Sequence, residues 1–207
     1  MRGRPAGLIL AGGLSRRMGE NKALAVLAGQ PMIAHVADRL APQVKTLAIN
    51  APAEPPLPLG LPVIQDTIKG YAGPLAGILA GLRHFAHTAP ETAYMLSVAV
   101  DTPFLPADLA KRLLDATSTA DEIVIARSND RLHPVIALWP LNLADELEAW
   151  LVDPQHRKLQ DFIARHTFTV VDFSSDGTTT GAIDPFFNVN SPDDLLRAQT
   201  MLDTSTP

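Results

Sequence analysis

The stretch from Leu8 to Lys22 constrains the fold more than any other part of this chain. It begins as an uninterrupted apolar run, continues through a glycine-rich turn and ends in cationic residues. A continuous apolar run is typical of a strand buried on both faces, as in a parallel sheet. Glycines let the backbone approach a phosphate closely, and arginine or lysine can neutralise its charge. The stretch therefore predicts a buried strand that presents a phosphate-binding loop. The loop residues are Gly12, Gly13, Arg16, Arg17 and Lys22.

The loop matches neither common phosphate-binding template. The Walker A pattern requires a glycine directly before its lysine, whereas two residues separate Gly19 from Lys22. The dinucleotide-binding pattern requires Gly-x-Gly-x-x-Gly, whereas Gly12 and Gly13 are adjacent. An ordinary strand-to-helix turn would explain the glycines but not the three cations beside them. We therefore interpret the stretch as a phosphate loop of another type.

The length and composition are those of a globular protein. The chain has 207 residues, of which 46% are hydrophobic and 19% charged. This length favours a single domain over residues 1–207, with residues 203–207 as a flexible tail. No apolar run approaches the ~20 residues that cross a membrane, and the short run behind the basic N-terminus does not fit a secretory signal. We expect a cytoplasmic protein without membrane contact.

The composition also excludes several kinds of chemistry. The absence of cysteine excludes disulfides, thiolate metal sites, iron–sulfur clusters and cysteine nucleophiles. A net charge of −5 argues against nonspecific binding to a nucleic-acid backbone and leaves open only a local basic site. The histidines lack the spacing of a zinc site, and no Ser-His-Asp signature stands out.

Predicted strands and helices alternate along most of the chain. Continuous apolar runs predict strands at residues 6–11, 44–49, 63–64, 94–100, 122–126, 133–139, 168–173 and 186–190. Helical spacing, prolines and capping residues predict helices at 31–40, 74–85, 107–116, 143–151, 158–165 and 192–202, the last with Ser191 as its N-cap. Residues 51–62, 127–132 and 174–180 are predicted loops. The alternation favours an α/β fold, a Rossmann-like three-layer α/β/α arrangement with a mostly parallel central sheet.

Candidate polar residues lie just beyond three of the predicted strands, Asn50 and Asp101 directly and Asp66 one residue further on. Ligands bind at this edge of a parallel sheet. Asp101 is the strongest candidate, because a carboxylate beside a phosphate loop needs a cation between them. Mg²⁺ prefers one or two carboxylates together with phosphate oxygens. A turn or N-cap aspartate is the alternative for Asp101. Asp66 could equally cap a turn, and Asn50 could bind a base or ribose or be an ordinary turn residue.

Two further residue pairs have suggestive spacing. Asn188 and Asn190 would share one face of a strand, although local capping is the commoner role. Gly77 and Gly81 lie four apart on one helix face, which predicts close packing against the sheet. His133 precedes a proline and is interpreted as a turn histidine.

Phosphate-binding amides, a lysine and a carboxylate-held Mg²⁺ suit phosphoryl or nucleotidyl transfer, because they stabilise charge on the transferring phosphorus. No general base is conspicuous. None is required if the nucleophile is itself an ionised phosphate.

The same residues resemble those of a known family. The loop Leu10-Ala11-Gly12-Gly13, with Ser15, Arg17-Met18-Gly19 and Lys22, is similar to the signature loop of the nucleotide-diphospho-sugar transferase-like nucleotidyltransferases. Three later stretches narrow the resemblance to the MobA-type molybdenum cofactor guanylyltransferases. They are Asp66 with residues 73–77, residues 101–106 and residues 187–195.

The resemblance implies an activity. It is the transfer of GMP from GTP to the terminal phosphate of molybdopterin or Mo-molybdopterin, with release of pyrophosphate. Molybdenum-insertion proteins and molybdoenzyme apoproteins or chaperones would be protein partners. Asn188 and Asn190 match a motif that the family places toward the pterin.

The resemblance also implies roles for residues around the nucleotide. Lys22, with Arg16 or Arg17, would support the leaving pyrophosphate, and Asp101 would hold Mg²⁺. Lys22, Asp101 and Arg17 are thus the predicted catalytic residues. The predicted nucleotide-binding residues are Leu10, Ala11, Gly12, Gly13, Lys22, Asn50, Asp66 and Asp101.

Alternatives remain at this point. Cytidylyltransferases for the same cofactor commonly have Leu-Ala-Ala-Gly in this loop, and we attach a preference for guanine to the second glycine, Gly13. A sugar-phosphate nucleotidyltransferase would be expected to be larger. A noncatalytic nucleotide- or cofactor-binding module would bind GTP without releasing pyrophosphate.

Overall fold

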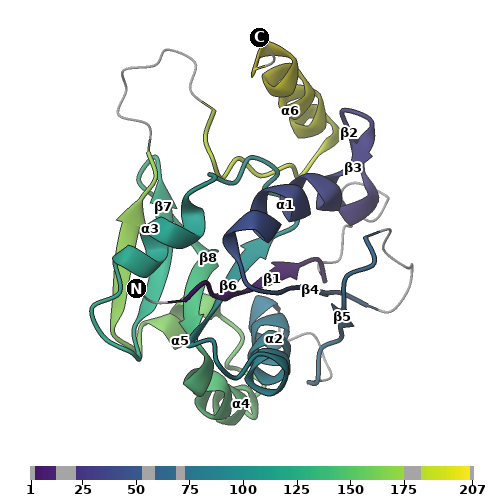
Figure 1. Ribbon diagram of the computed structural model, residues 1–207. Helices are drawn as coiled ribbons and strands as arrows, with labels where there is room; N and C mark the ends of the chain where they lie inside the picture. The colour runs from purple at the N-terminus through teal and green to yellow at the C-terminus, as the bar shows by residue number, and fades with distance from the viewer. Residues whose placement is uncertain (1–2, 13–21, 53–58, 69–72, 175–182, 206–207) are drawn as a thin grey trace.

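A seven-stranded sheet forms the centre of the computed structural model, which describes residues 3–12, 22–52, 59–68, 73–174 and 183–205 (Figure 1). The strand order is β5-β4-β1-β6-β8-β7-β9. The strands are β1 Ala6–Leu10, β4 Leu47–Asn50, β5 Val63–Ile64, β6 Tyr94–Ala99, β7 Ile123–Ser128, β8 Arg131–Pro140 and β9 Phe168–Asp172. All are parallel to one another except β8, which is antiparallel to its neighbours β6 and β7. This confirms the prediction of a mostly parallel sheet.

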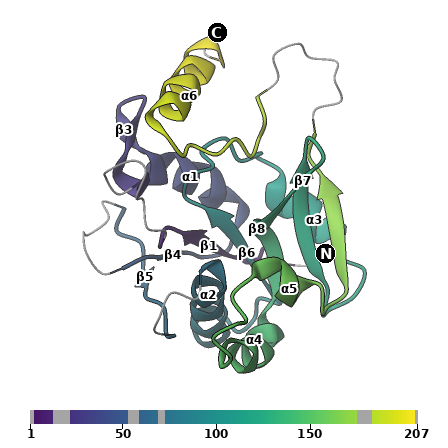
Figure 2. The same cartoon turned by 180° about the vertical axis from the view of Figure 1, so that it is seen from behind.

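Helices cover both faces of the sheet (Figures 1 and 2). The helices are α1 Met32–Leu40, α2 Pro74–Thr88, α3 Leu109–Asp115, α4 Ala144–Leu151, α5 Leu159–Ile163 and α6 Pro192–Ser205, with short 3₁₀ turns η1 Lys22–Leu24, η2 Ala41–Gln43 and η3 Leu141–Leu143. α1 and α3 pack on one face, and α2, α4 and α5 pack on the other. The predicted three-layer α/β/α arrangement is therefore confirmed. Among the described residues, none of the helices combines the length and apolar character of a membrane span.

The central strands β1, β4 and β6 are apolar except for the buried Asn50 and Ser97, because both of their faces are covered. In β1, Leu8 packs into the core beneath α2, whereas Ile9 packs into the core beneath α1 and α3. β6 has the same arrangement, with Met95 and Leu96 on opposite faces. This two-sided burial accounts for the continuous apolar runs from which these strands were predicted.

α2 lies close to the sheet because two of its residues are glycines. A Cβ atom built on Gly77 would lie 2.2 Å from Asn50 Oδ1, and one on Gly81 would lie 2.5 Å from Leu8 Cδ2. Both distances are far below van der Waals contact, so a larger residue at either position would force its neighbours to shift, and the glycines let α2 lie close to the sheet. The predicted role of this glycine pair is confirmed.

The loop predicted at residues 127–132 is instead a tight hairpin. β7 continues to Ser128 and β8 starts at Arg131, so Asn129 and Asp130 alone form the turn. Their φ angles are +47° and +59°. Two consecutive positive φ angles are typical of a type I′ turn, which asparagine and aspartate tolerate better than most residues.

The strand predicted at residues 186–190 is absent from this described segment. Phe186 and Val189 are its buried residues, a spacing of three that does not fit the alternation of a strand. Ser191 does cap the next helix, since the Asp194 amide donates to Ser191 Oγ at 3.2 Å. α6 then continues to Ser205, so residues 203–205 extend the helix rather than forming the expected tail.

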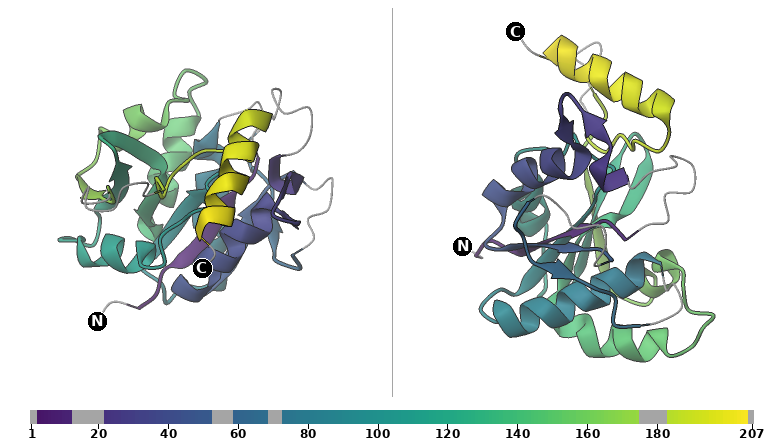
Figure 3. Two further views of the ribbon diagram at one scale, coloured as in Figure 1. Left: turned by 90° about the horizontal axis from the view of Figure 1, so that it is seen from above. Right: turned by 90° about the vertical axis from the view of Figure 1, so that its right-hand side faces the viewer.

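α6 stands outside the three layers (Figure 3). It packs beside a separate two-stranded ribbon formed by β2 Val26–Leu27 and β3 Gln30–Pro31. The amide of Ala28, in the turn of this ribbon, donates to Gln199 Oε1 of α6 at 2.8 Å. The sequence did not predict this ribbon, because Pro31 was assigned to the helix predicted at residues 31–40.

Candidate active site

The carboxyl ends of four strands meet at one edge of the sheet. Parallel pairing places Leu10 of β1 opposite Asn50 of β4 and opposite Ala99 of β6. Asn50 in turn lies opposite Ile64 of β5. The residues that follow these strands therefore emerge together, as the sequence predicted. They are Ala11, Gly12, Asp66 and Asp101.

Lys22 connects this edge to the C-terminal part of the chain. Its Nζ lies 3.3 Å from Asp101 Oδ2, and each of these two side chains is 20% exposed. The same Nζ donates to Asn190 Oδ1 at 2.5 Å. The backbone supports this contact, because the Val189 amide donates to the Asp101 carbonyl oxygen at 2.9 Å. Lys22, Asp101 and Asn190 thus form one polar cluster from three distant segments.

Asn50 and Asp66 form a second polar group at the same edge. The buried Asn50 donates from Nδ2 to Asp66 Oδ1 at 2.8 Å and to the Ile64 carbonyl oxygen at 3.1 Å. Both amide hydrogens are thereby used within the protein. The other end of the amide, Oδ1, faces Gly77. In this structure Asn50 therefore orients the Asp66 carboxylate, a role that the sequence did not indicate.

The first turn of α2 reaches this edge as well, since Gly77 lies against Asn50. Gly73, directly before the helix, has φ +63° and ψ −152°, a conformation that L side chains rarely adopt. Pro74 then suits the first helical position. The amino end of a helix favours negative charge, so this end of α2 adds to the anion-binding character of the edge.

Some predicted site residues are not brought together by these contacts. Gly13, Arg16 and Arg17 lie outside the described residues. Asn188 precedes Val189 in the same segment, but within the described ranges the contacts to Lys22 and Asp101 involve Asn190 and Val189 instead. His133, predicted in a turn, is buried in β8 and contacts Ser128.

The donor groups at this edge fit a hard divalent cation. Asp101 offers a carboxylate, which Mg²⁺ prefers, and it has one oxygen beyond the one that contacts Lys22. Asp66 follows β5, which β4 and β1 separate from β6, and its carboxylate contacts Asn50 instead. No group of three His, Cys, Asp or Glu side chains that could hold a metal occurs among the described residues. A cation here would accordingly take its remaining ligands from substrate phosphates and water.

In an open α/β sheet, ligands bind beyond the carboxyl ends of the strands, where this chain places a lysine–carboxylate pair, an arrangement that suits a nucleotide-binding transferase. The chain matches the family model for the MobA-like NTP transferase domain over residues 7–170. It therefore belongs to this nucleotidyltransferase family.

Named relatives and solved structures agree with the family assignment. A molybdenum cofactor guanylyltransferase from Rhizobium meliloti (strain 1021) is 48% identical over 200 residues, which cover 96% of this chain and 92% of the relative. The molybdopterin-guanine dinucleotide biosynthesis protein A of Archaeoglobus fulgidus is 26% identical, with a TM-score of 0.75 and coverage of 96% and 99%. A Mycobacterium tuberculosis protein solved in complex with manganese shares the fold at 16% identity, with a TM-score of 0.66 and coverage of 95% and 98%.

Proposed function

We propose that this chain transfers GMP from GTP to the terminal phosphate of molybdopterin or Mo-molybdopterin, forms the guanine dinucleotide cofactor and releases pyrophosphate. The observation that carries the proposal is the contact of Lys22 with Asp101 beyond β6. It supplies a cation and a carboxylate in a family that acts on nucleoside triphosphates. The name of the 48% identical relative supports GTP and the molybdenum cofactor as the substrates.

In the proposed reaction, an oxygen of the acceptor phosphate attacks the α-phosphorus of GTP in line with the leaving group. A new P–O bond forms, and the bond between the α-phosphorus and the oxygen that bridges to the β-phosphate breaks. Pyrophosphate leaves with that electron pair. Lys22 offsets the charge that develops on the phosphates, with Arg16 or Arg17 as further cations. The ionised acceptor phosphate needs no protein group to remove a proton.

The carboxylate of Asp101 would hold Mg²⁺, whereas Asn50 and Asp66 would lie at the guanosine side. When bound, the cation would neutralise phosphate charge and orient the triphosphate. The manganese complex of the M. tuberculosis neighbour supports a divalent ion in this fold. Leu10 and Ala11, at the end of β1, would line the nucleotide. Asn188 and Asn190 would lie on the pterin side.

We attribute the preference for guanine to Gly12 rather than to Gly13. Written residue against residue, Leu-Ala-Ala-Gly and residues 10–13 differ at Gly12 and agree at Gly13. A Cβ atom on Gly12 would lie 3.4 Å from Asn50 Oδ1, a contact with the amide that orients Asp66. An alanine here would therefore lie in van der Waals contact with Asn50, which is proposed to lie at the guanosine side.

The remaining expectations stay predictions. We propose that residues 1–207 form one nucleotidyltransferase domain, because most of the described strands join one sheet. A cytoplasmic location, and molybdenum-insertion proteins, molybdoenzyme apoproteins or chaperones as partners, are predicted from the sequence and the family alone.

A comparison of nucleotide binding tests the choice of substrate. We expect calorimetric titration with GTP, CTP and ATP, each with Mg²⁺, to give the tightest binding for GTP by at least about tenfold, because a site that hydrogen-bonds one base leaves polar groups unpaired with another. Equal or tighter binding of CTP would identify a cytidylyltransferase instead.

A further inference from the structure

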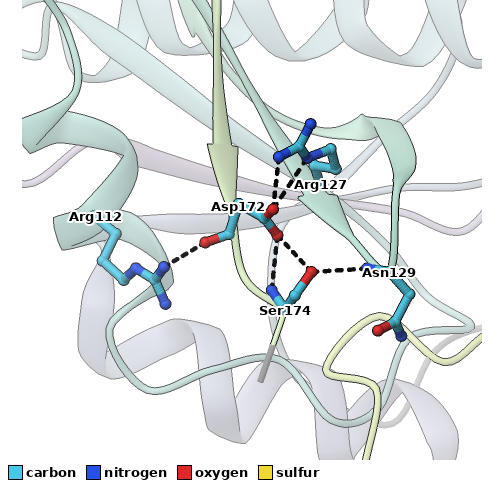
Figure 4. Close-up of polar contacts among 5 residues, drawn as sticks. All are labelled: Arg112, Arg127, Asn129, Asp172 and Ser174. Carbon is cyan, nitrogen blue, oxygen red and sulfur yellow. Dashed lines mark hydrogen bonds and ion pairs between the residues drawn. The ribbon is translucent and has the colours of Figure 1, made fainter. Parts of the chain in front are cut away.

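Three consecutive residues, the last two of β7 and the first of the hairpin turn, hold the chain on both sides of positions 175–182. Before these positions, Arg127 Nη2 lies 2.6 Å from Asp172 Oδ2, and the Asn129 amide donates to Ser174 Oγ at 2.9 Å (Figure 4). After these positions, Ser128 Oγ donates to Asp184 Oδ1 at 2.7 Å. The β7–β8 hairpin is therefore the attachment point for the segment 183–190, which leads to the Lys22 cluster.

Ser128 and His133 form a buried polar pair with a defined proton arrangement. Ser128 is 0% exposed, and its Oγ lies 2.8 Å from His133 Nε2. Because the single hydroxyl proton of Ser128 goes to the Asp184 carboxylate, His133 Nε2 must carry the proton that Ser128 Oγ accepts. Burial lowers the pKa of the His133 imidazole, although Asp184 opposes this effect. The aspartate here contacts the serine rather than the histidine, so these residues are not arranged as a hydrolytic triad.

Asp184 connects Ser128 to the residues that follow it in the segment. Its Oδ1 also accepts from the Phe186 amide at 3.0 Å. The Phe186 ring, 1% exposed, packs against His133 and Phe173 with centroid distances of 4.9 and 5.3 Å. Both polar and apolar contacts thus fix the start of the segment to β8 and to the end of β9.

The other end of the segment is fixed at the active site. Val189 is fully buried and donates its amide to the Asp101 carbonyl oxygen. Asn190 accepts from Lys22 Nζ. Only five residues separate Asp184 from Asn190, so a shift at the first is transmitted to the second over a short stretch of chain.

We propose that Ser128, His133 and Asp184 are positioning residues for the transfer reaction, because they set the place of the segment 183–190 against Lys22 and Asp101. Their link to the acceptor rests on the proposed function, in which this segment lies on the pterin side. None of the three is proposed to touch a substrate. They act by holding Asn190 and the Val189 backbone where the reacting phosphates are bound.

Two substitutions at Asp184 separate the hydrogen bond from the charge. Asp184→Asn keeps an Oδ1 that can accept from both Ser128 and the Phe186 amide, whereas Asp184→Ala removes the acceptor. Ser97→Ala is the matched control. Ser97 is also a fully buried serine of the sheet, with hydrogen bonds to Trp139 Nε1 and the Val135 carbonyl oxygen, but it has no contact with the segment 183–190 among those described.

Two measurements on the full-length protein test the proposal. We expect Asp184→Ala to remove hydrogen-exchange protection of the Val189 amide and to raise KM for molybdopterin on the order of tenfold to a hundredfold, since a small misplacement of binding groups costs that much. GTP affinity should fall by less than KM for molybdopterin rises, because the nucleotide-binding residues at the ends of β1, β4 and β5 make none of these contacts, although Lys22 and Asp101 do. Asp184→Asn should resemble the wild type, and Ser97→Ala should lower only the melting temperature.

The outcomes are decisive in either direction. Unchanged Val189 protection in Asp184→Ala would overturn the proposal, as would lost protection with an unchanged KM for molybdopterin, or an equal rise of KM in Ser97→Ala. If the wild type itself releases no pyrophosphate, the proposed function fails. The exchange of the Val189 amide then decides alone whether Asp184 positions the segment.

Discussion

Replacing Lys22 with alanine is expected to lower the rate of GMP transfer on the order of a hundredfold or more, because one preorganised contact to developing charge is lost. Lys22 is suited to this role by its position. Its ammonium group lies at the carboxyl edge of the sheet, held by Asp101 and Asn190 from two other segments. The measurement is pyrophosphate release at saturating GTP and molybdopterin.

Lys45→Ala is the matched control for this experiment. Lys45 also pairs with a carboxylate, that of Glu91, but this pair is exposed and lies before β4, at the opposite edge of the sheet. We expect its loss to leave turnover unchanged, since exposed ion pairs contribute little. Wild-type turnover in Lys22→Ala would remove Lys22 from the active site.

Gly77→Ala should weaken GTP binding by at least about tenfold, through displacement of groups that must be placed accurately. The new methyl group would meet Asn50 Oδ1 at 2.2 Å and Leu10 Cδ2 at 2.6 Å. Asn50 is already committed to Asp66 and to the Ile64 carbonyl oxygen, so it cannot move without releasing the Asp66 carboxylate. Calorimetric titration with Mg²⁺ and GTP measures the effect.

Gly81→Ala, one turn further along the same helix, provides the comparison. Its methyl group would meet Leu8 Cδ2 and Met95 Sδ, which belong to flexible side chains away from the sheet edge. Crowding there should lower the melting temperature and leave GTP affinity nearly unchanged. If both variants bind GTP equally well, or lose the same affinity, Gly77 has no special relation to the nucleotide.

The central sheet and its functional edge were predictable from the sequence because both depend on local signals. Strands buried on both faces are almost continuously apolar, as in β1 and β6, and a glycine turn follows β1 whereas Asp101 follows β6. Once the strands are parallel, their carboxyl ends coincide. This places Asp66 and Asp101 at one edge without any knowledge of tertiary contacts.

The parts that were missed depend on contacts between distant segments. Lys22 and Asn190 are 168 positions apart, and nothing in the local sequence pairs them. Asn190 was predicted in a strand because its neighbours are apolar. In the structure Phe186 and Val189 are buried instead, and the backbone of residues 186–190 is irregular. The hairpin at Asn129 was missed for a different reason. Its Asn-Asp pair is a local signal for a tight turn, but residues 127–132 were interpreted as a loop.

The buried contact of Ser128 with His133 and Asp184 could not be predicted from the sequence either. His133 lies beyond the hairpin turn, and Asp184 is 56 residues from Ser128. The register shift after Ile125 in the β7–β8 pairing brings His133 opposite Ala126, a detail that periodicity does not reveal. A search of the sequence for catalytic patterns therefore could not find these residues.

The most direct test of guanylyl transfer is pyrophosphate release by the purified protein with GTP, Mg²⁺ and molybdopterin. We expect release that requires all three components, is abolished by chelation of the metal, and falls on the order of a hundredfold in Asp101→Ala. Binding of GTP without any release, or wild-type release by Asp101→Ala, would contradict a metal-assisted transfer centred on Lys22 and Asp101.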